Sequence, residues 1–222
     1  MTDSPQGRLV ARLRDVTVLL DRFPALVRCE FDAYEGEVIF VQGPNGSGKT
    51  TLLRLLGGLV EAMTGSVFVF GRDPKTEARA IRREVSYLAH AYQMYEELSG
   101  RENLEFFAAT AGCDFDQALE WTHRLGLIDR DLGARFRVLS AGQRKKISAA
   151  IALSRRCELL LIDEPHALLD QVSKARLDSG FTELARAGRT VIVASHELDR
   201  ISALATRTYR MSNGSATLVE SA

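Results

Sequence analysis

One motif dominates this sequence: Gly43-Pro44-Asn45-Gly46-Ser47-Gly48-Lys49-Thr50. An apolar run at residues 38–41 precedes it, and a leucine-rich segment that begins at Thr51 follows it. The order strand, glycine-rich turn, helix is the context in which phosphate-binding loops occur. Glycines let backbone N–H groups point inward toward phosphate oxygens, and the positive end of the helix dipole adds to the attraction. The motif therefore predicts nucleotide binding by these residues, with Thr51 beside them.

Two side chains of the motif have predicted roles of their own. Lys49 would reach the terminal phosphates, and the hydroxyl of Thr50 would ligate Mg²⁺. The alternative is a glycine turn that matches the pattern by accident. Composition alone produces the pattern in on the order of one per cent of chains of this length, and the flanking strand and helix make such an accident rarer.

Composition limits the protein class. The chain has 222 residues, enough for one α/β domain with a full core. Its 29 Lys and Arg residues equal its 29 Asp and Glu residues, so no overall charge favours nucleic acid as a partner. The three cysteines are far apart and lack CxxC spacing, which argues against a disulfide framework or zinc site and fits a reducing cytosol.

The chain also lacks signals for membrane insertion. Residues 1–7 are polar, unlike a signal peptide. No apolar run approaches the roughly 20 residues that span a bilayer. We therefore expect a soluble protein whose membrane role, if it has one, comes through a partner.

Apolar patterning predicts the strands. The expected strands cover residues 9–19, 26–33, 37–41, 65–70, 85–89, 159–162 and 191–194, with a hairpin at 206–219 around Asn213-Gly214. Residues 9–19 alternate apolar and polar side chains and read as one or two edge strands. The all-apolar run 159–162 is typical of a strand buried on both faces of a parallel sheet. Residues 75–84 are polar and receive no assignment.

Helix signals fill the middle of the chain. Ser99, Asp114 and Ser140 are each placed to cap a helix, the third one covering residues 141–156. Trp121 is expected to pack within this block, and a further helix is expected at residues 172–187. The pattern indicates a helical lobe inserted into an α/β core.

Charged side chains follow the two buried strands. Asp163 ends the first strand, at the edge where α/β sheets bind ligands, and could hold Mg²⁺ through water. Glu164 beside it is a predicted general base for an attacking water. The alternative for this carboxylate pair is a helix cap. His196 ends the next strand, where it would contact the γ-phosphate or serve only as a structural histidine.

A second motif identifies a family. Leu139-Ser140-Ala141-Gly142-Gln143 opens the third helix and closely resembles the signature motif of ATP-binding-cassette ATPases, usually Leu-Ser-Gly-Gly-Gln. In that family residues 43–50 are the Walker A loop, residues 159–164 the Walker B strand with its catalytic Glu164, and His196 the switch histidine. Residues 167–170, ending at Asp170, occupy the D-loop. The resemblance covers essentially the whole chain.

The resemblance implies a fold. The expected architecture is an α/β P-loop NTPase core of mixed β-sheet with helices on both faces, an N-terminal antiparallel β-subdomain and an inserted α-helical subdomain. One domain would span residues 1–222, with the core at 1–90 and 157–222 and the helical part at about 91–156.

The resemblance also implies a mechanism and partners. ATP and Mg²⁺ would be bound, and the signature residues would close on the ATP of a second subunit, giving a head-to-tail homodimer. Integral membrane permease subunits would be partners, and the chain would lie peripherally on the cytoplasmic face of the cell membrane. A groove for a short permease helix is expected at residues 91–100, with local packing as the alternative. Residues 144–146 would add positive charge near the signature motif or form a solvated helix face.

Four positions depart from the family pattern. His90 stands where a glutamine contacts Mg²⁺ and the attacking water, with Gln93 as the rival for that role. Phe23 is the nearest aromatic residue for stacking on adenine, while Leu20 lies near the sequence position that this aromatic residue usually occupies in the family. In the D-loop His166 and Ala167 replace a more usual Thr-Ser pair, and Ala141 replaces a signature glycine.

These departures bear on the cargo. A histidine at position 90, the Leu-Ser-Ala-Gly-Gln signature and a short chain together resemble the ATP-binding subunit of the haem exporter used in cytochrome c biogenesis. The alternatives are the ATPase of another exporter, for a drug, lipid or polysaccharide, and a soluble ATPase such as one for iron–sulfur assembly.

Overall fold

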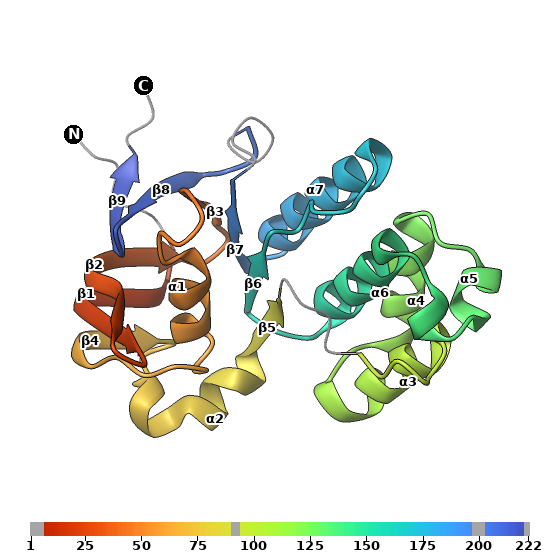
Figure 1. Ribbon diagram of the computed structural model, residues 1–222, viewed down its shortest axis with the longest axis horizontal. Coiled ribbons are helices and arrows are strands. Elements are labelled where there is room, and N and C mark those ends of the chain that lie inside the picture. Colours follow the sequence, from red (N-terminus) through yellow and green to blue (C-terminus); the bar gives the residue numbers. More distant parts are fainter. Residues whose placement is uncertain (1–6, 90–93, 197–202, 220–222) are drawn as a thin grey trace.

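The computed structural model describes residues 7–89, 94–196 and 203–219. Its strands form two sheets, one antiparallel and one mostly parallel, and a group of helices lies at the far end of the molecule (Figure 1). This is the α/β architecture with an N-terminal antiparallel sheet and a helical subdomain that the sequence predicts.

The antiparallel sheet has the order β2-β1-β4, made of β1 (Leu9–Leu20), β2 (Phe23–Tyr34) and β4 (Thr64–Val69). β1 pairs with both neighbours, so the prediction of an edge strand at residues 9–19 is wrong. The alternation that suggested an edge reflects burial of one face only, since Leu13, Val16 and Val18 are buried while the polar side chains between them face outward. A central antiparallel strand gives the same pattern.

The larger sheet has the order β5-β6-β7-β3-β8-β9. Parallel pairing joins β5 (Val85–Leu88), β6 (Leu159–Asp163), β7 (Thr190–Ser195), β3 (Val38–Gln42) and β8 (Arg207–Ser212). The last strand, β9 (Ser215–Val219), forms the predicted hairpin with β8 around Asn213 and Gly214, both at positive φ.

Helices cover both faces of this sheet. α1 (Lys49–Leu56) packs between the two sheets, where Leu159 and Leu161 of β6 join its core. The alternate residues Leu160 and Ile162 join a second core formed with α7 (Gln171–Arg186). β6 is therefore buried on both faces, as its all-apolar sequence predicts.

α2 (Pro74–Glu84) is a helix that the sequence reading missed. Asp73 caps it through the N–H of Lys75, and Pro74 occupies its first turn, where proline is favoured. Within it only Pro74 and Ile81 are buried. So little apolar periodicity remains that the segment reads as a polar loop.

The helical part comprises α3 (Gly100–Ala111), α4 (Phe115–Arg124), α5 (Asp129–Gly133), the 3₁₀ turn η1 (Phe136–Val138) and α6 (Ala141–Ser154). Its caps are those predicted, with Ser99 and Ser140 each forming a reciprocal capping box. It has an apolar core of its own. Trp121, expected in that core, lies instead in the core shared with α7, where a Cβ on Gly180 would stand 2.6 Å from its ring.

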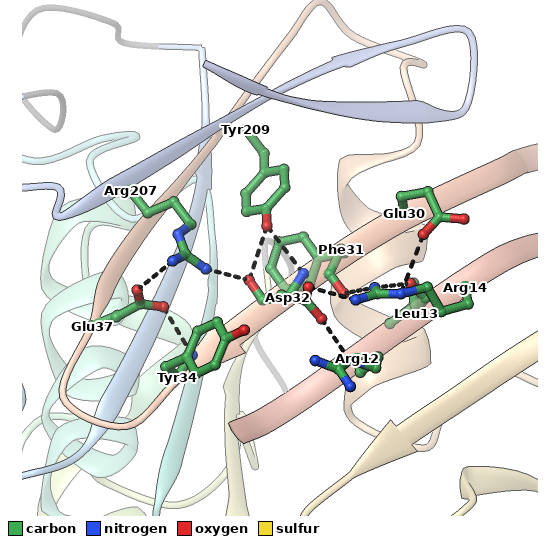
Figure 2. Close-up of polar contacts among 10 residues, drawn as sticks. All are labelled: Arg12, Leu13, Arg14, Glu30, Phe31, Asp32, Tyr34, Glu37, Arg207 and Tyr209. Carbon is green, nitrogen blue, oxygen red and sulfur yellow. Dashed lines mark hydrogen bonds and ion pairs between the residues drawn. The ribbon is translucent and has the colours of Figure 1, made fainter. Parts of the chain in front are cut away.

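A polar cluster joins the two sheets at Asp32 of β2 (Figure 2). Its carboxylate accepts hydrogen bonds from Arg12 and Arg14 of β1, at 3.0 and 2.6 Å. Its N–H donates to the Tyr209 hydroxyl at 3.0 Å, and that hydroxyl donates to the Asp32 carbonyl at 3.1 Å. Arg207 reaches the same carbonyl and pairs with Glu37. Side chains of β8 thus satisfy the backbone groups of Asp32 at the free edge of β2, which would otherwise be unpaired.

Tyr209→Phe should lower the free energy of unfolding by about 1 kcal/mol, because it removes both hydrogen bonds of a buried hydroxyl and keeps the ring. Urea denaturation measures the change. Tyr95→Phe, at a half-exposed ring, is the control and should be neutral. Equal stability of both variants would show that the Asp32 contacts add nothing.

Candidate nucleotide site

The glycine loop depends on backbone conformations that favour glycine. Gly46 and Gly48 have φ of +78° and +104°. A Cβ on Gly48 would stand 2.5 Å from the carbonyl oxygen of Ala25, and one on Gly43 would stand 2.5 Å from that of Met211. Gly48 is the N-cap of α1, and no described side chain caps this helix. The first N–H groups of α1 are therefore available to an anion.

Two side chains of the motif donate hydrogen bonds at this site. The Lys49 ammonium donates to the carbonyl oxygens of Gly43 at 2.7 Å and Pro44 at 3.1 Å. The Thr50 hydroxyl donates to Oδ2 of Asp163 at 2.7 Å. The glycine loop and the end of β6 thus bring together two side-chain oxygens, of Thr50 and Asp163, and oxygen is the ligand type that Mg²⁺ prefers.

Glu164 lies at the centre of a second cluster. Its Oε2 accepts a hydrogen bond from the Ser195 hydroxyl at 3.0 Å and lies 3.0 Å from Nδ1 of His196. Its backbone has φ +48° and its N–H donates to the carbonyl of Ala194. The parallel register Asp163↔Ala194 brings these residues together. No described helix begins at Asp163 or Glu164, so the helix-cap alternative is wrong.

Ser195 was absent from the predicted site. It is fully buried and holds the carboxylate from the neighbouring strand. Its position before His196, at the end of an apolar strand, is the one signal for it in the sequence. That signal is weak, because a serine at the end of a strand is equally suited to a turn.

A cavity of about 880 Å³ connects these groups. It is bounded by the glycine loop, the ends of β5 and β6, and Glu164 and His196. Leu20 and Ala25 form part of its wall, whereas Phe23 is not among the lining residues and is 79% exposed. His90 and Gln93 lie outside the described residues, whereas Tyr87 and Ala89, which precede them in the sequence, line the cavity. Their roles stay predictions.

The signature residues form the first turn of α6. Ser140 accepts from the N–H of Gln143 at 3.2 Å, and the Gln143 amide oxygen accepts from the N–H of Ser140 at 2.9 Å. A Cβ on Gly142 would stand 2.8 Å from the carbonyl oxygen of Leu168, so the D-loop lies against this turn. Ala141 begins α6 and Leu139, just before it, is buried. None of residues 139–143 is among the residues that line the cavity.

The basic residues after the motif contact their own subunit. Arg144 donates to the carbonyl of Leu139, and Lys146 pairs with Asp170 at 3.1 Å. Lys145 is only 1% exposed, and its ammonium has no hydrogen bond to a described residue. Burial lowers the pKa of this ammonium to about 8, opposed by the charges of Asp163 and Glu164. A solvated helix face is therefore wrong for Lys145.

Asp170 begins α7 as its N-cap. Its Oδ1 accepts from the N–H of Ser173 at 2.8 Å. This hydrogen bond, with those from the Ser173 hydroxyl and Lys146, holds the pKa of Asp170 well below its usual range. The D-loop aspartate is thereby fixed between α6 and α7.

Residues 26–167 match the ABC transporter family. The chain belongs to this family. The cytochrome c biogenesis ATP-binding export protein CcmA of Nitrosomonas europaea is 35% identical over 202 residues, covering 89% of this chain and 94% of that protein. The macrolide export ATP-binding/permease protein MacB 2 of Yersinia pestis is 33% identical over 211 residues, covering 89% of this chain and 31% of that longer protein.

A solved structure shares the ABC fold. It is a dimeric ATP-binding cassette in a post-hydrolysis state with ADP and phosphate, with a TM-score of 0.84 and 24% identity, covering 95% of this chain and 98% of that one. This chain is the ATPase subunit of an ABC transporter. Within its described residues, no helix is long and apolar enough to cross a membrane.

Gly48→Ala should abolish ATP binding, because the added Cβ meets the Ala25 carbonyl and the residue must keep φ +104°. Calorimetric titration with ATP measures the loss. Gly133→Ala adds a Cβ in open space and is the matched control. ATP affinity unchanged in Gly48→Ala would contradict the geometry of the loop.

Proposed function

We propose that this chain hydrolyses ATP to power haem export for cytochrome c biogenesis through separate membrane subunits. The cluster of Thr50, Asp163, Glu164 and His196 around one cavity carries the catalytic part of the proposal. The cargo rests on the CcmA relative, which aligns with this chain over nearly the whole length of both proteins. The MacB relative favours a second candidate, export of another small molecule.

Each side chain of the site has a proposed part in hydrolysis. The loop N–H groups and Lys49 bind the phosphates. Thr50 and Asp163 hold Mg²⁺, which when bound offsets phosphate charge. Glu164 accepts the proton of the attacking water as general base. Ser195 and His196 orient its carboxylate, and His196 also contacts the γ-phosphate.

Three predicted contacts complete this site. His90 reaches Mg²⁺ and the attacking water, with Gln93 as its rival. For the adenine ring Phe23 remains the aromatic choice, although Leu20 is the residue on the cavity wall. His90 and Gln93 lie outside the described residues, and Phe23 is not on the cavity wall, so these contacts are proposed.

We infer that a second copy of the chain completes the site. The signature turn at residues 139–143 is a helix N-terminus with a serine and a glycine, suited to an anion, yet it contributes nothing to the wall of its own cavity. A head-to-tail homodimer brings it to the ATP of the partner. The dimeric state of the similar cassette supports this arrangement.

We further infer that permease subunits dock at an apolar cavity of about 230 Å³. It lies where β5 faces α3 and α6, and Met94, Phe107 and Ile151 are among its lining residues. Met94 belongs to the segment in which the sequence predicts this groove. A short permease helix fits an apolar groove of this kind, and docking would hold the chain on the cytoplasmic face of the membrane. Nucleic acid is not a proposed partner.

Glu164→Gln should hydrolyse ATP at least about 100-fold more slowly while still binding it, because only the base is lost. Steady-state phosphate release and calorimetric binding separate the two effects. Glu120→Gln, at an exposed position on α4, should match the unmodified chain. A full hydrolysis rate in Glu164→Gln would remove Glu164 from the mechanism.

Replacing the chromosomal gene of the native host with one that encodes Glu164→Gln tests which cargo is exported. Haem staining should show loss of c-type cytochromes, while spectra of b-type cytochromes stay unchanged, because only export of haem is blocked. Normal c-type cytochromes together with lost resistance to a drug would favour the second candidate instead.

A further inference from the structure

A buried histidine–aspartate pair links the residue just before the D-loop segment 167–170 to α7. His166 is 1% exposed, and its Nε2 lies 2.7 Å from Oδ1 of Asp178 on α7. Among the described residues its Nδ1 has no hydrogen-bond partner. An Nε2–H that donates to the carboxylate accounts for the contact, and a buried hydrogen bond to a carboxylate is among the stronger kinds. The bond therefore ties the start of the D-loop to α7.

The rest of the loop is fixed as well. The N–H of Leu169 donates to the carbonyl of His166 at 3.2 Å, which closes a turn. Leu168 is held at φ +69°, and its carbonyl oxygen abuts Gly142 of the signature turn. Asp170 caps α7 and pairs with Lys146 of α6. One short loop thus joins Glu164 to the signature helix.

We propose that His166 is a positioning residue for ATP hydrolysis, whose hydrogen bond to Asp178 fixes Glu164 relative to the contact between Leu168 and Gly142. Glu164 serves the ATP of its own subunit, and Gly142 serves the ATP of the partner. The bond therefore sets the geometry between the two ATP sites of the dimer. This inference rests on the proposed roles of Glu164 and of the head-to-tail dimer.

His166→Leu and His166→Gln test the bond itself. Leucine removes it, whereas glutamine keeps an N–H that can reach Asp178. In His166→Leu the kcat should fall about tenfold or more, with KM and ATP affinity within about twofold of the unmodified chain, because Lys49 and Thr50 are unaffected. His166→Gln should recover most of the kcat. A residue that only fills space would leave glutamine as impaired as leucine, and that result overturns the proposal.

The control is His123→Leu, which removes an exposed histidine–aspartate pair between α4 and α5 and should leave kcat unchanged. If His166→Leu does not fold, Asp178→Ala decides, since alanine suits a helix and removes the acceptor. A folded Asp178→Ala with lowered kcat and unchanged ATP affinity supports the proposal, and one with full kcat overturns it. Failure of the proposed function is recognised separately, because Glu164→Gln would then hydrolyse ATP at the full rate. The kcat values of His166→Leu and His166→Gln can still be compared in that case.

Discussion

The hydrogen bond between Thr50 and Asp163 depends on strand order, and the rest of the site depends on the same constraint. β3, β7 and β6 are parallel neighbours, so all three end at one edge of the sheet. β3 delivers the glycine loop, β6 delivers Asp163, and β7 delivers His196. A polar cluster forms at that edge because each buried strand must end where polar groups can find partners.

Burial on both faces keeps this edge in place. The residues of β6 and β7 alternate between two apolar cores, one around α1 and one around α7. Neither strand can slip by one residue without exchanging its whole set of contacts. That rigidity allows Glu164 to hold a positive φ, a conformation that costs energy and persists only where surrounding structure enforces it.

The sequence predicted what depends on local pattern. The glycine loop, the caps Ser99 and Ser140, and the hairpin at Gly214 follow from residue type at fixed spacing, and all appear where expected. The sequence also placed Glu164 and His196 at the ends of two buried strands, and the parallel pairing of β6 with β7 brings them together.

What it missed depends on contacts distant in sequence. α2 has so narrow a buried face that no periodicity reveals it. Lys145 stands in a basic run, and only the packing of α6 shows that it is buried. Asp178 lies 12 residues after His166, so their contact cannot be read before α7 is placed. Likewise Leu20 reaches the cavity wall through the pairing of β1 with β2, where Phe23 points elsewhere.

The central claim is that one subunit holds half of each ATP site. The glycine loop and Glu164 line its cavity, whereas none of the signature residues 139–143 is among the lining residues. Sedimentation velocity of Glu164→Gln tests this directly, since the variant should bind ATP without hydrolysing it. The account predicts a monomer without nucleotide and a dimer with ATP and Mg²⁺, lost when Gly142→Trp blocks the signature turn. A Gly142→Trp variant that still dimerises with ATP would contradict it.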